Sequence, residues 1–425
     1  MIRALSTRLR RADGAERLPR EVGVLAVVAF CVAVGFGVVV PVLPVFARSF
    51  GVDNFAVGAV ISAFALMRLC ASPFVGRLIR AWGERVALAV GIGIVALSSG
   101  LAGLAATYPQ LLVLRGIGGI GSALFTVSAT SLLLAAAGPA RRGRAAGLFQ
   151  GGFLIGGMAG PAIGGVLAAI SLRAPFFFYA ATLAVAGAVG LVLLRSPARP
   201  AVDPDAVAGI PQPEVDRTAV PLRRIVADRR FQAACLTNLA QGWTSFGVRS
   251  ALVPVIITEV LDRPASWTGI AFACAAVVQT LALYPAGTFV DRVGRRPAMV
   301  GAGLLAAVSI MAVALAPNLT VAVIALCGYG VAAAFLGTAP AAAVGDAGGA
   351  RGGTAVAVFS MCSDAGAIVG PLVAGALADA VSFPVAFGVG AALLALAALN
   401  ALRMPGGVPG GGPAPATGST TVARS

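Results

Sequence analysis

Four charged side chains lie inside long apolar stretches of this chain, where a charge is costly. They are Asp364 and three arginines, Arg68, Arg115 and Arg249. A carboxyl group in apolar surroundings favours its neutral form unless a nearby arginine stabilises its charge. Asp364 is the only acidic residue deep in such a stretch, about 15 Å from its nearer end. It is therefore a candidate for reversible protonation, and the alternative is a permanent ion pair with an arginine.

Arg115 belongs to the pattern Leu111, Arg115, Gly119 and Gly121 within one apolar stretch. An arginine near the middle of a membrane helix costs about 2.5–3.5 kcal/mol on insertion scales, so it normally faces the protein interior or a watery cavity. Because Arg115 is about 9 Å from the nearer helix end, the alternative is that it reaches the membrane surface. Three arginines against one aspartate predict a positive cavity, which suits anionic or neutral amphipathic molecules.

Other polar and aromatic residues of the apolar stretches are candidates for lining a central cavity. The chain contains no histidine, and its six cysteines form no Cys-x-x-Cys pair, so the sequence predicts no metal site. It also contains neither clustered buried carboxylates nor a phosphate-binding loop, which argues against an enzyme. The further cavity candidates are Gln150, Asn238, Gln241, Trp243, Phe246, Gln279 and Tyr284.

These residues must be positioned by helices that cross a membrane. The chain is 59% hydrophobic and 11% charged, whereas soluble domains carry about 25% charged residues. Apolar runs of about 20 residues, the length that spans a bilayer, predict twelve helices. They cover residues 22–46, 54–76, 86–107, 109–137, 145–170, 175–194, 231–257, 267–289, 297–316, 319–344, 354–379 and 382–403.

The distribution of arginine predicts the orientation of these helices. All 31 basic residues are arginine, and most lie before the first helix, in alternate loops and between the two sets of six helices. The positive-inside rule then places both termini in the cytoplasm, in a plasma membrane. Because the net charge of +15 reflects this topology, no nucleic-acid partner is expected. The predicted segments are a basic cytoplasmic segment (1–21), a six-helix bundle (22–194), a cytoplasmic linker (195–230), a second six-helix bundle (231–403) and a disordered tail (404–425).

Two glycine-rich segments each occur twice at an offset of about 210 residues, which indicates a duplicated bundle. Glycine permits tight turns and close contacts between helices. Gly76–Arg85 is echoed by Gly287–Arg296, with Gly76, Arg80, Gly83, Arg85, Gly287, Asp291, Arg292, Gly294, Arg295 and Arg296 as candidate conformational residues. Gly156–Gly165 is echoed by Gly366–Gly375, and its candidates are Gly156, Gly160, Pro161, Gly164, Gly165, Gly366, Gly370, Pro371 and Gly375.

Two six-helix halves, each with a glycine-bracketed basic loop after its second helix, resemble the major facilitator superfamily of secondary transporters. The second-half loop is similar to the family pattern GxLaDRxGRR, whereas Arg80 stands where the family has an aspartate in the first-half loop. In the family this loop pairs charges with a neighbouring helix and latches one conformation. The alternative is that these arginines serve only the topology.

The resemblance also extends to two motifs associated with coupling. The residues around Gly160 and Pro161 are similar to the family signature gxxxGPxxGG, which is associated with antiport, and Arg115 fits the RxxxGxG pattern of proton-coupled members. The resemblance implies an all-α integral membrane protein, built as two pseudo-symmetric six-helix bundles in the major facilitator fold.

The function that this resemblance implies is proton-coupled export of drug-like or metabolite molecules by alternating access. The alternatives are import of a sugar, organic acid or other nutrient, and a membrane sensor that transports nothing. A small-molecule substrate and the lipid bilayer are the expected partners, and the chain is expected to be monomeric. No cofactor is expected, with the proton as the coupling ion. The Ala-, Gly- and Arg-rich composition is typical of a bacterial protein.

Overall fold

The computed structural model describes residues 18–137, 141–194, 226–348 and 353–405. Most of the predicted N-terminal segment, most of the predicted linker and nearly all of the predicted tail lie outside these ranges. In the described part of the chain every regular element is helical, which confirms the predicted all-α membrane fold. Eleven of these helices are long and apolar enough to cross a membrane.

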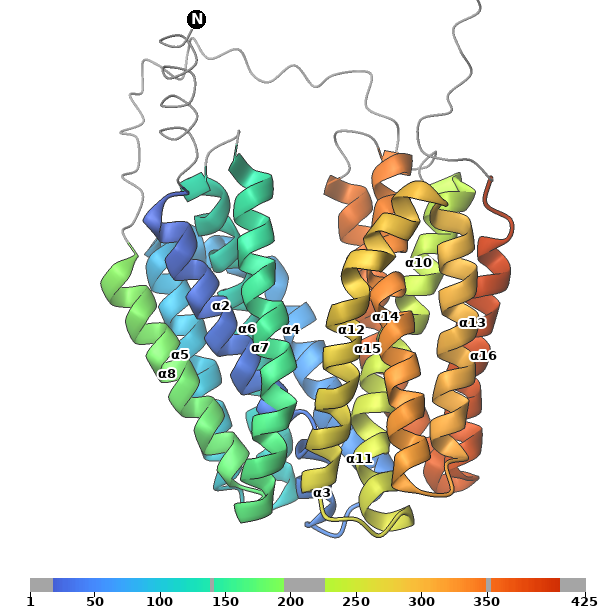
Figure 1. Ribbon diagram of the computed structural model, residues 1–425. Helices are drawn as coiled ribbons and strands as arrows, with labels where there is room; N and C mark the ends of the chain where they lie inside the picture. Colours follow the sequence, from blue (N-terminus) through green and yellow to red (C-terminus); the bar gives the residue numbers. More distant parts are fainter. Residues whose placement is uncertain (1–17, 138–140, 195–225, 349–352, 406–425) are drawn as a thin grey trace, which may run out of the picture.

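The first half of the chain forms one bundle, drawn in blue to green in Figure 1. Its helices agree with the predicted apolar runs to within a few residues, except that the first run is interrupted near Val40. They are α2 (Arg20–Val39), α3 (Leu43–Arg48), α4 (Asn54–Trp82), α5 (Glu84–Gly103), α6 (Tyr108–Ala137), α7 (Arg142–Ile170) and α8 (Ala174–Leu193).

The second half forms a matching bundle, drawn in yellow-green to red in Figure 1. Five of its helices are continuous, and the remaining one is assembled from four consecutive helical pieces. The continuous helices are α12 (Ser266–Arg292), α13 (Arg295–Ala314), α14 (Leu319–Gly348), α15 (Gly353–Ala380) and α16 (Phe383–Ala401). The assembled helix consists of α10 (Arg229–Gly242), η2 (Trp243–Leu252), α11 (Val253–Val255) and η3 (Ile256–Val260).

The assembled helix departs from the plain α-helix predicted over residues 231–257, because η2 and η3 are π-helices. Proline has no N–H to donate to the carbonyl four positions earlier, so Pro254 leaves the carbonyl of Ser250 without that partner. In the preceding turn the Ser250 hydroxyl group donates to the carbonyl of Ser245 at 2.7 Å. Pro44 precedes Pro254 by 210 residues, the offset of the repeat. It lies where α2 has ended and α3 begins, so the same position disturbs the first helix of both halves.

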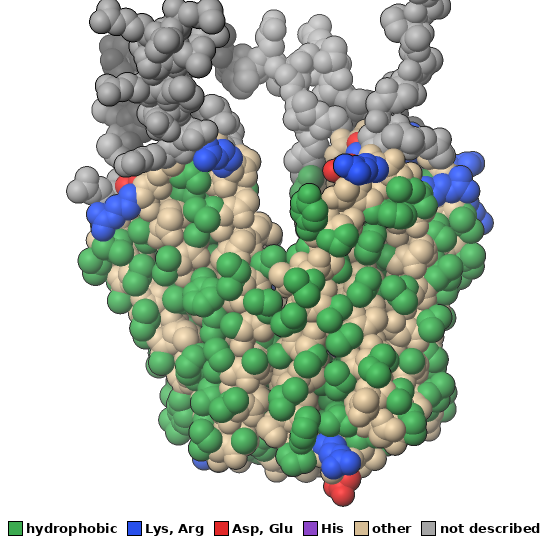
Figure 2. All heavy atoms as spheres, in the orientation of Figure 1, with side chains coloured by type: hydrophobic (Ala, Val, Ile, Leu, Met, Phe, Trp, Pro, Cys, Tyr) green, Lys and Arg blue, Asp and Glu red, His purple; other side chains and the backbone are tan. Residues whose placement is uncertain are grey.

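Each bundle has its own apolar core. Leu25, Leu88 and Phe176 are fully or almost fully buried in the first, and Leu252 and Phe387 are fully buried in the second. On the face shown in Figure 2 the flanks of both bundles carry hydrophobic side chains, and the charged side chains visible there lie at the two ends. This distribution is the one that a bilayer around the bundles requires, because the hydrocarbon layer favours apolar side chains.

Glycine makes two of the tight turns between helices. Gly83, between α4 and α5, has φ of 79°, and Gly294, between α12 and α13, has φ of 116°. Residues with a Cβ are strained in this left-handed region. Gly83 and Gly294 are the second glycines of the two basic segments, whereas the first glycines, Gly76 and Gly287, lie within α4 and α12.

Candidate functional site

A cleft separates the two bundles at one end of the molecule, as Figure 2 shows from the side. The bundles close on each other toward the opposite end, where α4 contacts α15 and α7 contacts α12. Between the bundles lies a cavity of about 470 Å³ that is lined by residues of both halves. Among the helices that line it are α4 of the first bundle and α12 of the second. Its residues include Phe36, Phe64, Phe125, Phe153, Tyr179, Phe246 and Phe272, and the polar Ser122, Thr126, Gln279 and Thr280.

The cavity is lined by the three arginines predicted from the sequence, Arg68, Arg115 and Arg249. Arg68 donates from one terminal nitrogen of its guanidinium group to Oδ1 of Asp364 at 2.6 Å. Arg68 is near the middle of α4, and Asp364 is in α15, so this ion pair joins the two halves. The structure therefore contains the arginine pair that the sequence left as the alternative to free protonation of Asp364.

Arg115 is only 7% exposed. Its guanidinium carbon lies 4.6 Å from the centre of the Phe64 ring, a distance at which a cation is attracted to the face of an aromatic ring. Its Nε atom is buried and has no hydrogen-bond partner among the described residues. Arg115 therefore faces the protein interior and not the membrane surface, and its charge is supported chiefly by aromatic contact.

Arg249 lies in the π-helical segment η2 of the opposite bundle. Its guanidinium carbon is 5.5 Å from the Phe272 ring centre and 5.7 Å from that of Tyr329. Its Nε atom is also buried without a hydrogen-bond partner in the described part of the structure. π-Helical turns are frequent at functional sites, because they shift side chains relative to a regular helix.

The structure divides the other seven cavity candidates. Phe246 and Gln279 line the cavity, whereas Gln150 is exposed and Tyr284 is 85% exposed. Trp243 is part of the apolar core of the second bundle. Asn238 donates from Nδ2 to the carbonyl of Phe359 at 2.7 Å, and Gln241 is half-buried; among the described residues neither lines the cavity.

Sequence reasoning missed the aromatic walls of the cavity. Phe64, Tyr179 and Phe272 line it, and each resembles a core residue in the sequence because it lies in an apolar helix. A usable signal was present for Phe64, which is four residues before Arg68 on the same helix. Residues four apart lie on one helix face, so the arginine identifies the face that turns toward the cavity.

The repeated glycine motif of α7 and α15 serves two different contacts. Gly156, Gly160 and Gly164 face α2, where an added Cβ would lie within 2.8 Å of the backbone or of Ala33 at each position. Gly165 instead faces α12 of the other half, and its Cβ would lie 2.7 Å from the carbonyl of Ser266. The first three glycines therefore hold one bundle together, and the fourth lets the two bundles touch.

The second copy of this motif has the same division. Gly366 and Gly370 face the helix formed by α10 and η2, at Leu239 and Trp243. Gly375 faces α4 of the other half, where a Cβ would collide with the carbonyl of Asn54. The neighbouring prolines differ, since Pro161 lines the cavity whereas the carbonyl of Pro371 contacts Gly58 of α4.

Arg295 and Arg85 of the basic loops each contact a helix of their own bundle. Arg295 forms an ion pair with Asp346 of α14, with Nε to Oδ2 at 2.5 Å, and Arg85 donates to the carbonyl of Leu191. Asp291 and Arg292 are exposed, as is Arg80, and Arg296 is half-buried. Added Cβ atoms at Gly76 and Gly287 would meet no close contact, so space does not require glycine there.

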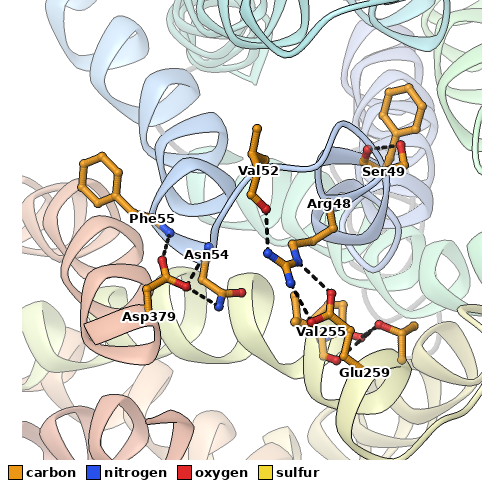
Figure 3. A network of polar contacts seen from close by, with 11 residues as sticks. Arg48, Ser49, Val52, Asn54, Phe55, Val255, Glu259 and Asp379 are labelled. Carbon is orange, nitrogen blue, oxygen red and sulfur yellow. Dashed lines mark hydrogen bonds and ion pairs between the residues drawn. The ribbon is translucent and has the colours of Figure 1, made fainter. Parts of the chain in front are cut away.

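Two polar contacts join the halves at the closed end (Figure 3). Arg48 forms a two-pronged ion pair with Glu259, with Nε to Oε1 at 2.7 Å and the second nitrogen to Oε2 at 2.8 Å. This hydrogen bond raises the pKa of Arg48. Asp379 of α15 accepts from the backbone N–H groups of Asn54 and Phe55 at 3.1 and 2.8 Å, and from Asn54 Nδ2 at 2.7 Å. One bundle thus caps the first turn of a helix in the other.

Comparison with known proteins places this architecture in a family. The sequence model of the Major Facilitator Superfamily matches residues 25–262 and 234–422. The chain is 31% identical over 170 residues to Multidrug resistance protein 1 of Bacillus subtilis (strain 168), and this alignment covers 40% of this chain and 44% of the relative. It is 29% identical over 183 residues to Quinolone resistance protein NorA of Staphylococcus aureus, covering 42% and 46%. Each alignment thus spans less than half of the relative.

Solved structures show the same fold at low sequence identity. A bacterial homologue of the human lysosomal transporter Spinster, titled as inward-facing and unoccupied, superposes with a TM-score of 0.72 at 18% identity and covers 90% of this chain and 94% of the other. A mutant of the nucleoside transporter NupG superposes with a TM-score of 0.73 at 15% identity, covering 90% and 99%. From its two bundles and the match to both halves of the chain, this protein belongs to the Major Facilitator Superfamily and is a multi-pass membrane protein.

Proposed function

We propose that this protein exports amphipathic small organic molecules in exchange for protons, by alternating access of one cavity to the two sides of the membrane. The observation that carries this proposal is the placement of the Arg68–Asp364 pair. It joins the two halves, and its arginine lines the cavity that both halves form. A proton taken up at Asp364 would remove the negative charge that holds Arg68, and so would change the contact between the halves.

The direction of transport rests on the relatives. Two of them are named for resistance to drugs or to quinolones, and resistance by a membrane carrier requires export. The positive-inside rule supports a cytoplasmic position for the end with the open cleft. The described arginines around the α4–α5 and α6–α7 loops lie at this end. In this orientation the cavity would collect molecules from the cytoplasm.

The cycle then requires the closed end to open. Opening would separate Arg48 from Glu259 and Asp379 from the first turn of α4. The close contacts of Gly165 and Gly375 with the opposite bundle would separate as well. Because these contacts are concentrated at one end, the two bundles can rock about the cavity without unfolding, as alternating access requires.

The test measures export and coupling together. Efflux-deficient cells expressing the wild type or Asp364→Asn are loaded with a neutral aromatic dye or with norfloxacin, an aromatic carboxylic acid, with and without a protonophore. We expect lower accumulation with the wild type, restored to the level of empty cells by the protonophore or by the substitution. Export that survives both treatments would contradict coupling through Asp364. Unchanged accumulation despite confirmed membrane expression would contradict export of such compounds.

The same purified protein in liposomes separates export from import. An acidic exterior, equivalent to the outside of the cell, should drive substrate out of liposomes that hold the protein in the cellular orientation. Movement of substrate together with the proton would instead indicate an importer. Binding without counterflow would indicate a sensor.

A further inference from the structure

Two of the three cavity arginines keep an uncompensated charge. Arg68 is neutralised by Asp364, whereas the guanidinium groups of Arg115 and Arg249 lie over aromatic rings. Each has a buried Nε atom without a hydrogen-bond partner in the described part of the chain. Leaving a charged donor buried and unpaired is costly. A chain that retains two such groups beside one cavity is expected to use them on a ligand.

The remainder of the wall does not supply the missing negative charge. Among the described residues that line the cavity there is no aspartate or glutamate. Asp364 is directed to Arg68 at 2.6 Å. Apolar walls strengthen the field of a charge, because they exclude the water that would screen it. The cavity therefore attracts anions and repels organic cations.

The shape and composition of the wall indicate what carries the negative charge. The cavity has a volume of about 470 Å³, within the range of about 300–1,000 Å³ that suits drug-sized molecules. Phenyl rings from both bundles line it, among them Phe64 beside Arg115 and Phe272 beside Arg249. A flat aromatic body can stack against such rings, and a guanidinium group binds a carboxylate through two parallel hydrogen bonds.

We infer that the substrate is an aromatic organic anion, with a carboxylate or sulfonate group bound by Arg115 of one bundle and Arg249 of the other. This inference names the substrate class of the proposed exporter. Transport of the anion rests on the proposed function, whereas binding of the anion does not. Because the two arginines belong to different bundles, a bound anion links the halves at the cavity. Arg68 remains with Asp364, so anion binding and the proposed proton carrier use separate arginines.

The experiment measures binding to the purified full chain in detergent by isothermal titration calorimetry. Three probes share one ring system and differ in charge: 2-naphthoate, 2-naphthamide and 2-naphthylmethylammonium. We expect 2-naphthoate to bind at least tenfold more tightly than the amide, and the ammonium probe to bind more weakly than the amide. Hydrogen bonds to charged groups are stronger than those to neutral groups, which gives this order.

Substitutions then assign the preference to the two arginines. Arg115→Gln and Arg249→Gln should each reduce the affinity for 2-naphthoate about tenfold or more and leave that for 2-naphthamide nearly unchanged. Arg115→Lys should retain part of the preference, because lysine keeps the charge but not the fork of donors. Arg173→Gln is the matched control, since Arg173 is exposed in the loop before α8, away from the cavity. Retained affinity for the amide shows that a variant is folded.

Several outcomes would overturn the inference. Equal binding of 2-naphthoate and 2-naphthamide, or unchanged preference in both glutamine variants, would show that the arginines do not bind the anion. Phosphatidylglycerol is tested as a competitor. Displacement of 2-naphthoate by this lipid at low concentration would assign the site to an anionic headgroup instead. Export of neutral dyes without anion binding would refute this inference alone, whereas anion binding without any transport would refute the proposed export alone.

Discussion

The contact of Asp379 with the first turn of α4 is expected to hold the closed end shut. Its carboxylate accepts three hydrogen bonds from Asn54 and Phe55 and lies at the positive end of the helix dipole, where negative charge is favoured. A single capping bond contributes about 0.5–2 kcal/mol. Because Asp379 accepts three hydrogen bonds but is exposed to solvent, we take about 1–2 kcal/mol for all of them together. Loss of this amount changes the ratio of closed to open molecules about 5–30-fold.

Asp379→Asn is the sharpest perturbation, because the amide keeps one accepting oxygen but turns its NH₂ group toward a backbone donor. The assay is electron–electron double resonance between spin labels at Arg173→Cys of the first bundle and Asn318→Cys of the second, in a background without the native cysteines. Both positions are exposed in loops at the closed end. We expect the population with the short wild-type distance to fall and a longer distance to appear.

Asp262→Asn is the matched control, since Asp262 is an exposed carboxylate in a loop at the same end. Its φ of 50° is one that asparagine also tolerates. It should leave the distances unchanged. If Asp379→Asn also leaves them unchanged, the cap does not contribute to closure, and the reasoning from its three hydrogen bonds is refuted.

Other perturbations test the remaining contacts. Gly165→Val should open the closed end and abolish transport, because its side chain would collide with α12. Gly157→Ala is the control and should keep the fold and the distances, because no atom lies near the added Cβ. Normal transport by Gly165→Val would contradict this prediction. Glu259→Gln should weaken closure by less than about 1 kcal/mol, because Arg48 and Glu259 are partly exposed and salt screens such pairs. The test is the same distance measurement at low and high salt. A large effect of the substitution at high salt would contradict this prediction. Gly294→Ala should lower the melting temperature measured by differential scanning fluorimetry, because its φ of 116° is strained for alanine; an unchanged value would show that the turn can relax.

Much of the fold could be predicted from local sequence. A helix that crosses a bilayer must bond its own backbone and present apolar side chains, so long apolar runs identified most of the helices to within a few residues. The repeat of Gly83 at Gly294 identified two turns that require positive φ. The π-helical winding around Arg249 was not predicted, because the missing N–H of Pro254 frees one carbonyl but does not determine how the preceding turns rearrange.

The candidate site was predicted in part. Charge inside an apolar run is a local signal, and it identified Arg68, Arg115, Arg249 and Asp364, all of which the structure places near the contact between the halves. Polarity alone was a poor guide for uncharged residues, as the exposure of Tyr284 shows. A tyrosine or glutamine can lie on any helix face at little cost, whereas an intramembrane charge cannot.

The sequence by itself determined that this protein is a duplicated bundle of membrane helices with a few costly charges inside, because hydropathy, charge and repeated glycines act over short distances along the chain. Only the tertiary structure decided how those charges are used. It brought Asp364 to Arg68 from the other half of the chain, and it left Arg115 and Arg249 facing aromatic rings around one cavity. Such pairings depend on the rotation and separation of helices in different bundles, which the packing of whole helices sets and which no local pattern encodes.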